Sequence, residues 1–257
     1  MIGIFDSGAG GLSVVREVIR LLPDERYVYF ADNAHCPYGE KSREYVCERA
    51  RVITRHLLEE GCGIVTVACN TATAAAIGTL RAEFDIPFVG MEPAVKPAAA
   101  LTRSGVVGVL ATAGTLKAEK YHDTRDRWSA DIKIVEHVGE GFVRLVENGL
   151  TEGPEAEETV RRSLQPLLDA GADTIVLGCT HYPFLLPLMQ SIAGKDVRFI
   201  DPAPAAARQL QRLAGEGGLL RHDGFSMKLE ASGDDSTLSH LYSGIAGKFH
   251  SVNAEQI

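Results

Sequence analysis

The sequence predicts an α/β protein made of two pseudosymmetric parallel-sheet α/β domains, with the active site in the cleft between them. Short apolar runs alternate with helix-length amphipathic segments along the 257 residues, and the runs show little polar alternation. Strand and helix alternating in this way indicate βαβ units, and continuous apolar strands are typical of sheets covered by helices on both faces. A weak internal repeat predicts that the chain has two related halves.

The expected elements follow from this alternation. Short runs rich in β-branched and other apolar residues are the expected strands, at 2–5, 27–31, 64–68, 87–90, 106–110, 132–136, 174–178 and 197–200. Between them, longer segments with polar and apolar positions are expected helices, near 12–22, 42–60, 71–84, 94–103, 116–128, 139–149, 154–170, 184–193 and 202–214. The segment 215–257 changes character. A strand over 224–232 and a short helix over 237–247 are expected there, packed on one of the domains.

Three pairs of segments carry the internal repeat. They are GIFDSGAGG at 3–11 with GVLATAGT at 108–115, IVTVACNTAT at 64–73 with TIVLGCTHYP at 174–183, and GMEPA at 90–94 with FIDPA at 199–203. Chance similarity between strand-rich segments is the alternative, but the shared order and nearly constant offset favour duplication. We expect residues 1–96 plus 207–257 to form the first domain and residues 97–206 to form the second.

Composition limits the classes of partner. The formal net charge is −8 and no long Lys/Arg run occurs, which argues against nucleic acid or an anionic membrane as the main partner. A few local donors can still bind an acidic small molecule. There is no stretch of 18 apolar residues and no basic segment followed by a long apolar one at the start, so we expect no membrane span, no signal peptide and a cytoplasmic location.

The cysteines are expected to be free thiols. Their odd number and the lack of a CxxC pair make a disulfide framework improbable, and the lack of Cys/His ligand spacing predicts no metal site. We interpret Cys47 and Cys62 as packing residues, and the role of Cys36 stays open.

Cys69 and Cys179 differ from the other cysteines because each follows a strand and precedes polar residues that can start a helix. Asn70 and Thr71 are the expected cap after Cys69, and Thr180 is the expected cap after Cys179. A thiol at a helix N-terminus lies in a positive field that favours the thiolate. A lone cysteine here would be read as a buried spacer, but two in matching strand-end positions favour a catalytic pair.

Racemisation explains why two such thiols would be needed. The α-proton leaves from one face of a carbon and a proton arrives on the other, so two acid–base groups complete the reaction without rotating the carbanion. A thiol pKa of about 8.5 is closer to neutrality than that of Lys or Tyr. A gap wide enough for a substrate, with Cα atoms more than roughly 7 Å apart, would prevent a disulfide.

A glycine-rich turn follows the first strand. It matches neither GxGxxG nor GK[ST], so we expect its backbone N–H groups to approach a substrate carboxylate rather than a nucleotide phosphate. Asp6 would approach the substrate ammonium or the Cys69 thiol, whereas the matching position of the second half lacks an acid. His181 is placed to assist Cys179, and Glu147 by itself would be read as a solvated helix residue.

These segments resemble the glutamate racemase family of bacterial cell-wall synthesis. The resemblance rests on IGIFDSGAGGLSV near the start, PYG at 37–39, ACNTA at 68–72, EPA at 92–94, FVRLVENG at 142–149 and GCTHYP at 178–183. It implies two α/β domains, no cofactor, and interconversion of L- and D-glutamate that supplies D-glutamate for peptidoglycan synthesis, cell-wall biogenesis and cell shape. A homodimer is compatible with it.

The resemblance also implies roles for individual residues. Cys69 and Cys179 would be the catalytic thiols. Asp6, Glu147 and His181 would assist them. The implied substrate contacts are Asp6, Ser7, Tyr38, Gly39, Asn70, Thr71, Thr180 and His181, with Thr112 and Thr115 as further candidates. Where family members often have GDTARxPYG, this chain has ADNAHCPYG, so we expect local details of this wall to differ around His35 and Cys36 while the chemistry is retained.

Three alternatives remain open. The nearest is an aspartate or hydantoin racemase of the same superfamily, because side-chain length is discriminated by few contacts. A cysteine hydrolase could use Cys179 with His181 as base, but it would leave Cys69 unexplained. A non-enzymatic ligand-binding module is the third.

Overall fold

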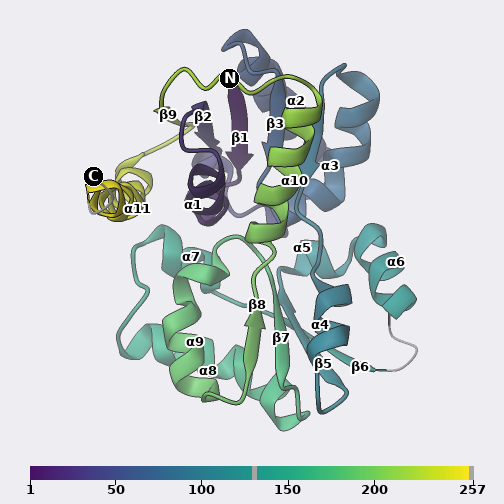
Figure 1. Ribbon diagram of the computed structural model, residues 1–257. Helices are drawn as coiled ribbons and strands as arrows, with labels where there is room; N and C mark the ends of the chain where they lie inside the picture. Colours follow the sequence, from purple (N-terminus) through teal and green to yellow (C-terminus); the bar gives the residue numbers. More distant parts are fainter. Residues whose placement is uncertain (129–131, 255–257) are drawn as a thin grey trace.

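Two parallel sheets, each at the centre of its own lobe, make up the protein (Figure 1). The computed structural model describes residues 1–128 and 132–254. The first sheet consists of β1 (Ile2–Asp6), β2 (Arg26–Ala31), β3 (Ile64–Val67), β4 (Phe88–Gly90) and β9 (Ser226–Ala231). The second consists of β5 (Val106–Ala111), β6 (Lys133–Val138), β7 (Thr174–Gly178) and β8 (Arg198–Ile200). All the predicted strands are therefore present, and the predicted fold class is confirmed.

The two sheets share one topology. The strand orders are β4-β3-β1-β2-β9 and β8-β7-β5-β6, and every neighbouring pair is parallel. The first four strands of each half thus occupy equivalent places, with β1 matching β5 and β3 matching β7. This equivalence supports the duplication that the repeated segments predicted.

Helices cover both faces of each sheet. Those of the first lobe are α1 (Leu12–Leu21), α2 (Arg43–Glu59), α3 (Asn70–Glu83), α10 (Ala203–Glu216) and α11 (Ser236–Ala254), with short 3-10 turns η1 (Ala9–Gly11), η2 (Asn33–His35) and η3 (Tyr38–Glu40). Those of the second lobe are α4 (Val95–Leu101), α5 (Ala113–Leu116), α6 (Glu119–Trp128), α7 (Phe142–Glu147), α8 (Pro154–Asp169) and α9 (Leu186–Ala193), with the 3-10 turn η4 (Tyr182–Leu185).

Apolar faces of the helices close the core. In α1, Val14, Val15 and Val18 share one face, are fully buried, and pack toward α10 and the first sheet. Full burial of one such side chain contributes about 1.5–3 kcal/mol relative to exposure. The amphipathic spacing read from the sequence therefore fixes which face of the helix meets the sheet.

Two predicted helices are interrupted. The segment 116–128 is divided between α5 and α6, and the segment 184–193 begins as the turn η4 before α9 starts at Leu186. Pro187 lies in the first turn of α9, where its missing N–H has no intrahelical acceptor to lose. The proline thus marks a new helix start rather than a bend within a longer helix.

The C-terminal segment returns to the first lobe. β9 pairs in parallel with β2 at the edge of the first sheet, and α11 packs beside α1. The expected strand and the packing on one domain are confirmed, but α11 is longer than the short helix expected over 237–247. Residues 255–257, part of the predicted first domain, lie outside the described residues.

The predicted domain limits at 96/97 and 206/207 fall inside helices. The whole of α4 packs against β5 and β7, and α10 packs against α1. We propose that the chain crosses between the lobes just before each of these helices, because a helix that packs on one sheet belongs to that lobe.

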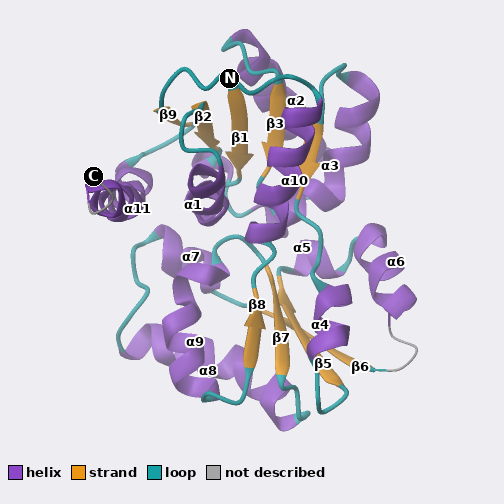
Figure 2. Ribbon diagram, in the orientation of Figure 1, coloured by secondary structure: helices purple, strands orange, loops and turns teal. Residues whose placement is uncertain are grey.

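The carboxyl ends of the two sheets face each other. Figure 2 shows the strands of the first sheet and strand β8 of the second pointing toward the boundary between the lobes, and β8 is parallel to its neighbours. Ligands of open parallel sheets bind beyond these ends. None of the helices in the described part of the chain is long and apolar enough to cross a bilayer.

Candidate active site

A narrow pocket lies where the two lobes meet. The first lobe contributes Ser7, Pro37, Tyr38, Gly39, Cys69, Asn70 and Thr71, and the second contributes Thr112, Val143, Cys179, Thr180 and His181. One cysteine of the predicted pair thus reaches the pocket from each lobe. A larger pocket of about 750 Å³, lined by Arg81, Glu92 and Gln209 among others, lies elsewhere and contains neither thiol.

Cys69 caps helix α3 with its own side chain. Its sulfur accepts a hydrogen bond from the Ala72 backbone N–H at 3.4 Å, and its thiol donates to Ser7 Oγ at 3.8 Å. The expectation that Asn70 or Thr71 would be the cap is therefore wrong. The Ala72 N–H at the helix N-terminus does favour the thiolate, as expected, but burial and the nearby Asp6 carboxylate outweigh it and raise the pKa of Cys69 well above its ordinary value.

Asp6 ends strand β1 and is completely buried beside this thiol. Its Oδ2 atom accepts hydrogen bonds from the Gly11 N–H at 2.7 Å and from Thr180 Oγ1 at 3.3 Å. Its Oδ1 atom is buried without a hydrogen-bond partner among the described residues. Burial raises the pKa of Asp6, so the carboxylate is a stronger proton acceptor than an exposed one.

Cys179 follows β7 directly, but no α-helix begins after it. The 3-10 turn η4 starts at Tyr182, and Thr180 caps no helix. The predicted effect of a helix N-terminus on this thiol is therefore absent, because a short 3-10 turn sums too few aligned peptide dipoles. Instead, Nδ1 of His181 lies 3.7 Å from the Cys179 sulfur.

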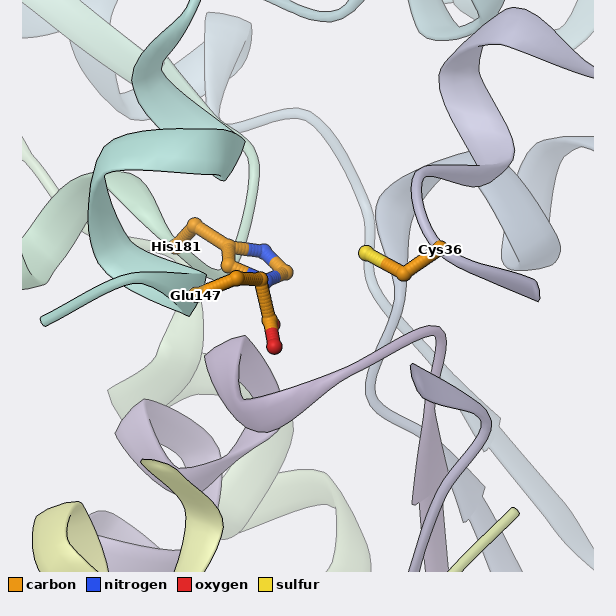
Figure 3. Close-up of side chains that lie close together, drawn as sticks. All are labelled: Cys36, Glu147 and His181. Carbon is orange, nitrogen blue, oxygen red and sulfur yellow. The ribbon is translucent and has the colours of Figure 1, made fainter. Parts of the chain in front are cut away.

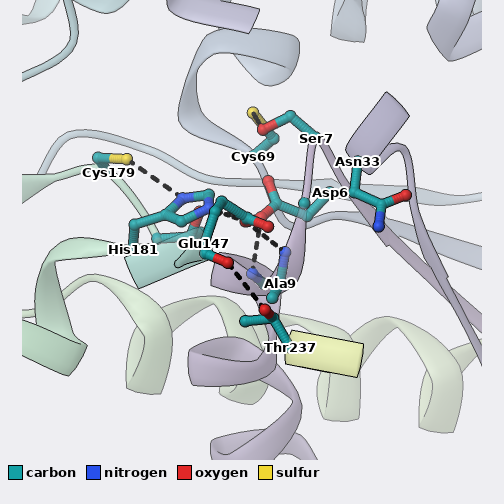
Figure 4. Close-up of polar contacts among 12 residues, drawn as sticks. Asp6, Ser7, Ala9, Asn33, Cys69, Glu147, Cys179, His181 and Thr237 are labelled. Atoms are coloured by element: carbon teal, nitrogen blue, oxygen red, sulfur yellow. Dashed lines mark hydrogen bonds and ion pairs between the residues drawn. The ribbon is translucent and has the colours of Figure 1, made fainter. Parts of the chain in front are cut away.

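The other side of the His181 ring contacts Glu147. Nε2 lies 2.6 Å from Glu147 Oε1, which also accepts a hydrogen bond from the Ala9 N–H at 2.7 Å (Figure 4). Burial opposes the charged imidazole, but hydrogen bonds to the thiols of Cys179 and Cys36 and to the Glu147 carboxylate raise the pKa of His181 well above its ordinary value. Burial likewise opposes the charged carboxylate, yet the histidine lowers the pKa of Glu147. The two form a buried ion pair, so Glu147 is not a solvated helix residue.

Two backbone N–H groups of the glycine-rich turn bind the carboxylates of Glu147 and Asp6, so not all of them are left for the substrate. The N–H groups of Ala9 and Gly11 are occupied by Glu147 and Asp6. For these two groups, the expected contact with a substrate carboxylate is wrong. The glycines also make room, because a Cβ at Gly8 would overlap the Glu147 carboxylate.

The wall that carries Tyr38 and Gly39 is held rigidly. The Tyr38 hydroxyl donates to buried Asp32, and Arg49 Nη2 pairs with the same carboxylate at 2.8 Å. These donors hold the pKa of Asp32 below its ordinary value although burial opposes the charge. The Tyr38 hydroxyl is thus committed to Asp32, which leaves its ring and backbone to face the pocket.

Other polar groups that line the pocket remain available to a ligand. The side-chain amide of Asn70 is buried at the pocket, and neither its nitrogen nor its oxygen has a hydrogen-bond partner among the described residues. Buried amides without partners are costly, so such a pair of atoms indicates a ligand that completes them. Thr71 Oγ1 joins Thr112 Oγ1 at 2.9 Å and Thr115 Oγ1 at 3.4 Å, which brings the candidate threonines of both lobes together.

Two contributors were not expected from the sequence. Thr237, at the start of α11, donates its hydroxyl to the Glu147 carbonyl at 2.8 Å, and Figure 4 shows it beneath the histidine–glutamate pair. Ser13 Oγ donates to the Thr180 carbonyl at 2.9 Å across the boundary between the lobes. No local pattern marks either residue, because each acts on a segment far away in the sequence.

Comparisons with known proteins agree with this geometry. The family model described as Asp/Glu/Hydantoin racemase matches residues 2–210. A glutamate racemase of Ectopseudomonas mendocina is 53% identical over 220 residues, which cover 85% of this chain and 84% of that protein. Among solved structures, a glutamate racemase isoform from Bacillus anthracis superposes with a TM-score of 0.86 at 32% identity, covering 96% of this chain and 94% of the other. A Francisella tularensis glutamate racemase in complex with D-glutamate gives a TM-score of 0.81 at 28% identity, covering 95% and 92%.

Proposed function

The chain belongs to the Asp/Glu/hydantoin racemase family, and on that premise we propose that it interconverts L- and D-glutamate with Cys69 and Cys179 as paired acid and base. The observation that carries this proposal is the meeting of the two thiols, one from each lobe, in a single pocket. A single-base enzyme would have no use for the second sulfur. Two sulfurs on opposite walls can exchange protons with opposite faces of one carbon.

The reaction needs one thiolate and one thiol at a time. The thiolate removes the α-proton from one face of the amino acid, which leaves a planar carbanion stabilised by its carboxylate. The thiol on the other wall donates its proton to the opposite face and becomes a thiolate. The proton inventory is unchanged and the configuration is inverted, so the reverse reaction uses the same groups in exchanged roles.

Each thiol has its own assisting group. On the Cys69 side, buried Asp6 is the nearby proton acceptor, and its charge is also one cause of the high pKa of that thiol. On the Cys179 side, Nδ1 of the protonated His181 ring faces the sulfur and can donate to it, and the Glu147 carboxylate holds the ring in place. The two walls are therefore chemically unequal. The sequence predicted this, because Ala111–Thr112, the position of the second half that matches Asp6, has no acid.

Substrate binding is assigned to the polar lining. The unpartnered Asn70 amide is the strongest candidate for a contact with the amino acid's carboxylate or ammonium group. The proposed contacts are Asp6, Ser7, Tyr38, Gly39, Asn70, Thr71, Thr180 and His181. All but Asp6 line the pocket, and Asp6 lies behind Thr180 through their shared hydrogen bond.

The proposed role is the supply of D-glutamate for peptidoglycan synthesis in the cytoplasm, and thereby cell-wall biogenesis and cell shape. It rests on the family resemblance of the sequence motifs and on the similarity to glutamate racemases. A homodimer stays a prediction.

Circular dichroism of the purified protein with L-glutamate, then D-glutamate, tests the activity without added cofactor. Either enantiomer should relax to the racemate, and solvent deuterium should enter the α-position. Inversion of aspartate in place of glutamate would reassign the substrate within the family. A covalent acyl-enzyme without α-deuteration would instead support a hydrolase that uses Cys179 and His181.

A further inference from the structure

Cys36 lies beside the histidine–glutamate pair, although no step of the proposed reaction uses it. Figure 3 shows its sulfur directed toward the His181 ring, against which the Glu147 side chain lies. One potential ligand atom from each of Cys36, Glu147 and His181 lies within 4.8 Å of the others. Cys36 comes from the first lobe, whereas Glu147 and His181 come from α7 and the segment after β7 in the second lobe.

We propose that Cys36, Glu147 and His181 form a binding site for a divalent zinc-like cation that inhibits the enzyme. The sequence predicted no metal site because these residues are far apart in the chain and show no ligand spacing. The fold brings them together, so the spacing argument misses the cluster.

The donor set suits zinc. A thiolate sulfur, an imidazole nitrogen and a carboxylate oxygen are its preferred protein ligands, and three of them leave a fourth tetrahedral position for water or a substrate group. Ligand atoms in a tetrahedral zinc site lie roughly 3–4 Å apart, so small side-chain movements would convert the observed cluster into a coordination shell. Mg²⁺ prefers oxygen ligands, so both the thiol and the imidazole disfavour it.

The carboxylate has coordinating capacity left. Only Oε1 of Glu147 accepts the hydrogen bonds from His181 and Ala9. Oε2 of Glu147 makes no hydrogen bond with the described residues. It can therefore bind a cation while Oε1 keeps its bond to the Ala9 N–H. Cys36 is partly exposed, which gives an ion a route to the cluster from solvent.

A second cluster of possible ligands is a poor cation site. It consists of His56, Glu60 and Glu230. Lys228 already places its ammonium 2.6 Å from Glu60 and 2.8 Å from Glu230. A metal ion there would have to displace that charge. The cluster at Cys36 contains His181 instead, which can lose a proton and become a ligand.

Inhibition follows from the position that the ion would take beside His181. The inference of inhibition rests on the proposed function. Coordination through Nε2 would break the contact between the His181 ring and Glu147 that holds Nδ1 against the Cys179 sulfur. The ion would also bridge the lobes and hold the mouth of the pocket in one arrangement. Metal binding itself is independent of whether the enzyme racemises glutamate.

The test uses chelator-treated, desalted full-length protein with Zn²⁺, and with Co²⁺ as a spectroscopic probe. Equilibrium dialysis should show one zinc ion per chain, and Co²⁺ should give the near-ultraviolet charge-transfer band of a thiolate ligand. Cys36→Ser should abolish that band and weaken zinc binding by at least about tenfold. Cys47→Ser is the matched control, because Cys47 lies in α2 and its thiol donates to the Ala75 carbonyl, a bond that serine can keep.

Activity provides a separate readout. Zn²⁺ should inhibit the wild type and the Cys47→Ser variant, whereas Cys36→Ser should keep its activity at the same concentrations. Absence of stoichiometric zinc binding to the wild type would overturn the proposal. So would a charge-transfer band that persists in Cys36→Ser, because the thiolate ligand would then be another cysteine. Failure of racemisation alone would leave both binding results unaffected.

Discussion

Nε2 of His181 lies 2.6 Å from Oε1 of Glu147, and the same carboxylate oxygen accepts the Ala9 N–H from the other lobe. His181 is thus oriented by an acid that is itself held by a backbone N–H of the first lobe. A movement that separates the lobes would remove Ala9 from Glu147 and weaken the charge that holds the imidazolium. This geometry links domain closure to the protonation state of the Cys179 side.

Glu147→Gln tests that link through pH. Glu147 helps raise the pKa of His181, so its removal lets the imidazole lose its proton at lower pH. The alkaline limb of the kcat profile should therefore move toward lower pH, and kcat should fall about tenfold or more, since a hydrogen bond to a charged group contributes about 1.5–3 kcal/mol. Profiles are measured with EDTA present. An unchanged alkaline limb would mean that Glu147 does not control this proton.

Thr237→Val tests the support of Glu147 from the C-terminal helix. Loss of the hydroxyl leaves the Glu147 carbonyl without this donor, at a cost of about 0.5–1.5 kcal/mol. We expect kcat to fall about fivefold, the factor that corresponds to about 1 kcal/mol, with KM unchanged. Ser243→Ala is the control, because that exposed hydroxyl of the same helix bonds only within α11. Equal effects of the two substitutions would reduce Thr237 to a general contributor to helix stability.

Cys69→Ser and Cys179→Ser test the assignment of one thiol to each face. Each should lower racemisation by about 10²- to 10⁴-fold, the usual contribution of a positioned acid or base, while the far-ultraviolet spectrum stays native. Each variant should still exchange the α-proton of one enantiomer with solvent deuterium. Comparable exchange of both enantiomers by either variant would contradict the two-face arrangement.

Asp6→Asn separates the electrostatic from the catalytic effect of this acid. The Asp6 carboxylate raises the pKa of Cys69, so the neutral amide should lower that pKa and speed alkylation of Cys69 at a given pH. Racemisation should nevertheless fall, because the proton acceptor is lost. Peptide mapping after iodoacetamide treatment follows the thiol, and circular dichroism follows the reaction. Slower alkylation together with slower racemisation would point to a disturbed pocket.

The position of the thiols could be predicted from the sequence for a simple reason. Cys69 and Cys179 directly follow apolar strands, and the carboxyl ends of parallel strands gather at one edge of a sheet. The internal repeat then predicted that the carboxyl ends of the two sheets face each other. The same reasoning located Asp6 after β1, because strand ends are set by local pattern.

Properties that depend on tertiary contacts could not be predicted. The pKa of Cys69 is raised because tertiary packing buries it beside Asp6, an effect that outweighs the helix terminus. Thr237 reaches Glu147 across 90 residues of sequence. Cys36 joins Glu147 and His181 only after both lobes have formed. The local pattern of the sequence gives no information about these tertiary contacts.

The glycines of the turn after β1 provide the sharpest test of lobe contact. A Cβ at Gly10 would overlap the His181 ring, so Gly10→Ala should push the imidazole away from Cys179 and Glu147. Overpacking of this kind typically costs about 1–3 kcal/mol of stability, and a displacement of about 1 Å at a catalytic group can cost about 100-fold in rate. We therefore expect a loss of activity of about 100-fold, which corresponds to about 2.7 kcal/mol, beside a loss of stability of similar size.

Gly78→Ala is the matched control, because Gly78 lies on the exposed face of α3 with nothing within 4 Å of an added Cβ. It should be neutral or stabilise the protein by about 0.5–1 kcal/mol, since alanine favours the helix. Thermal unfolding and the circular-dichroism assay are run on both variants. If Gly10→Ala kept wild-type kcat, the ring of His181 would not need its present position, and the role given to it on the Cys179 side would be wrong.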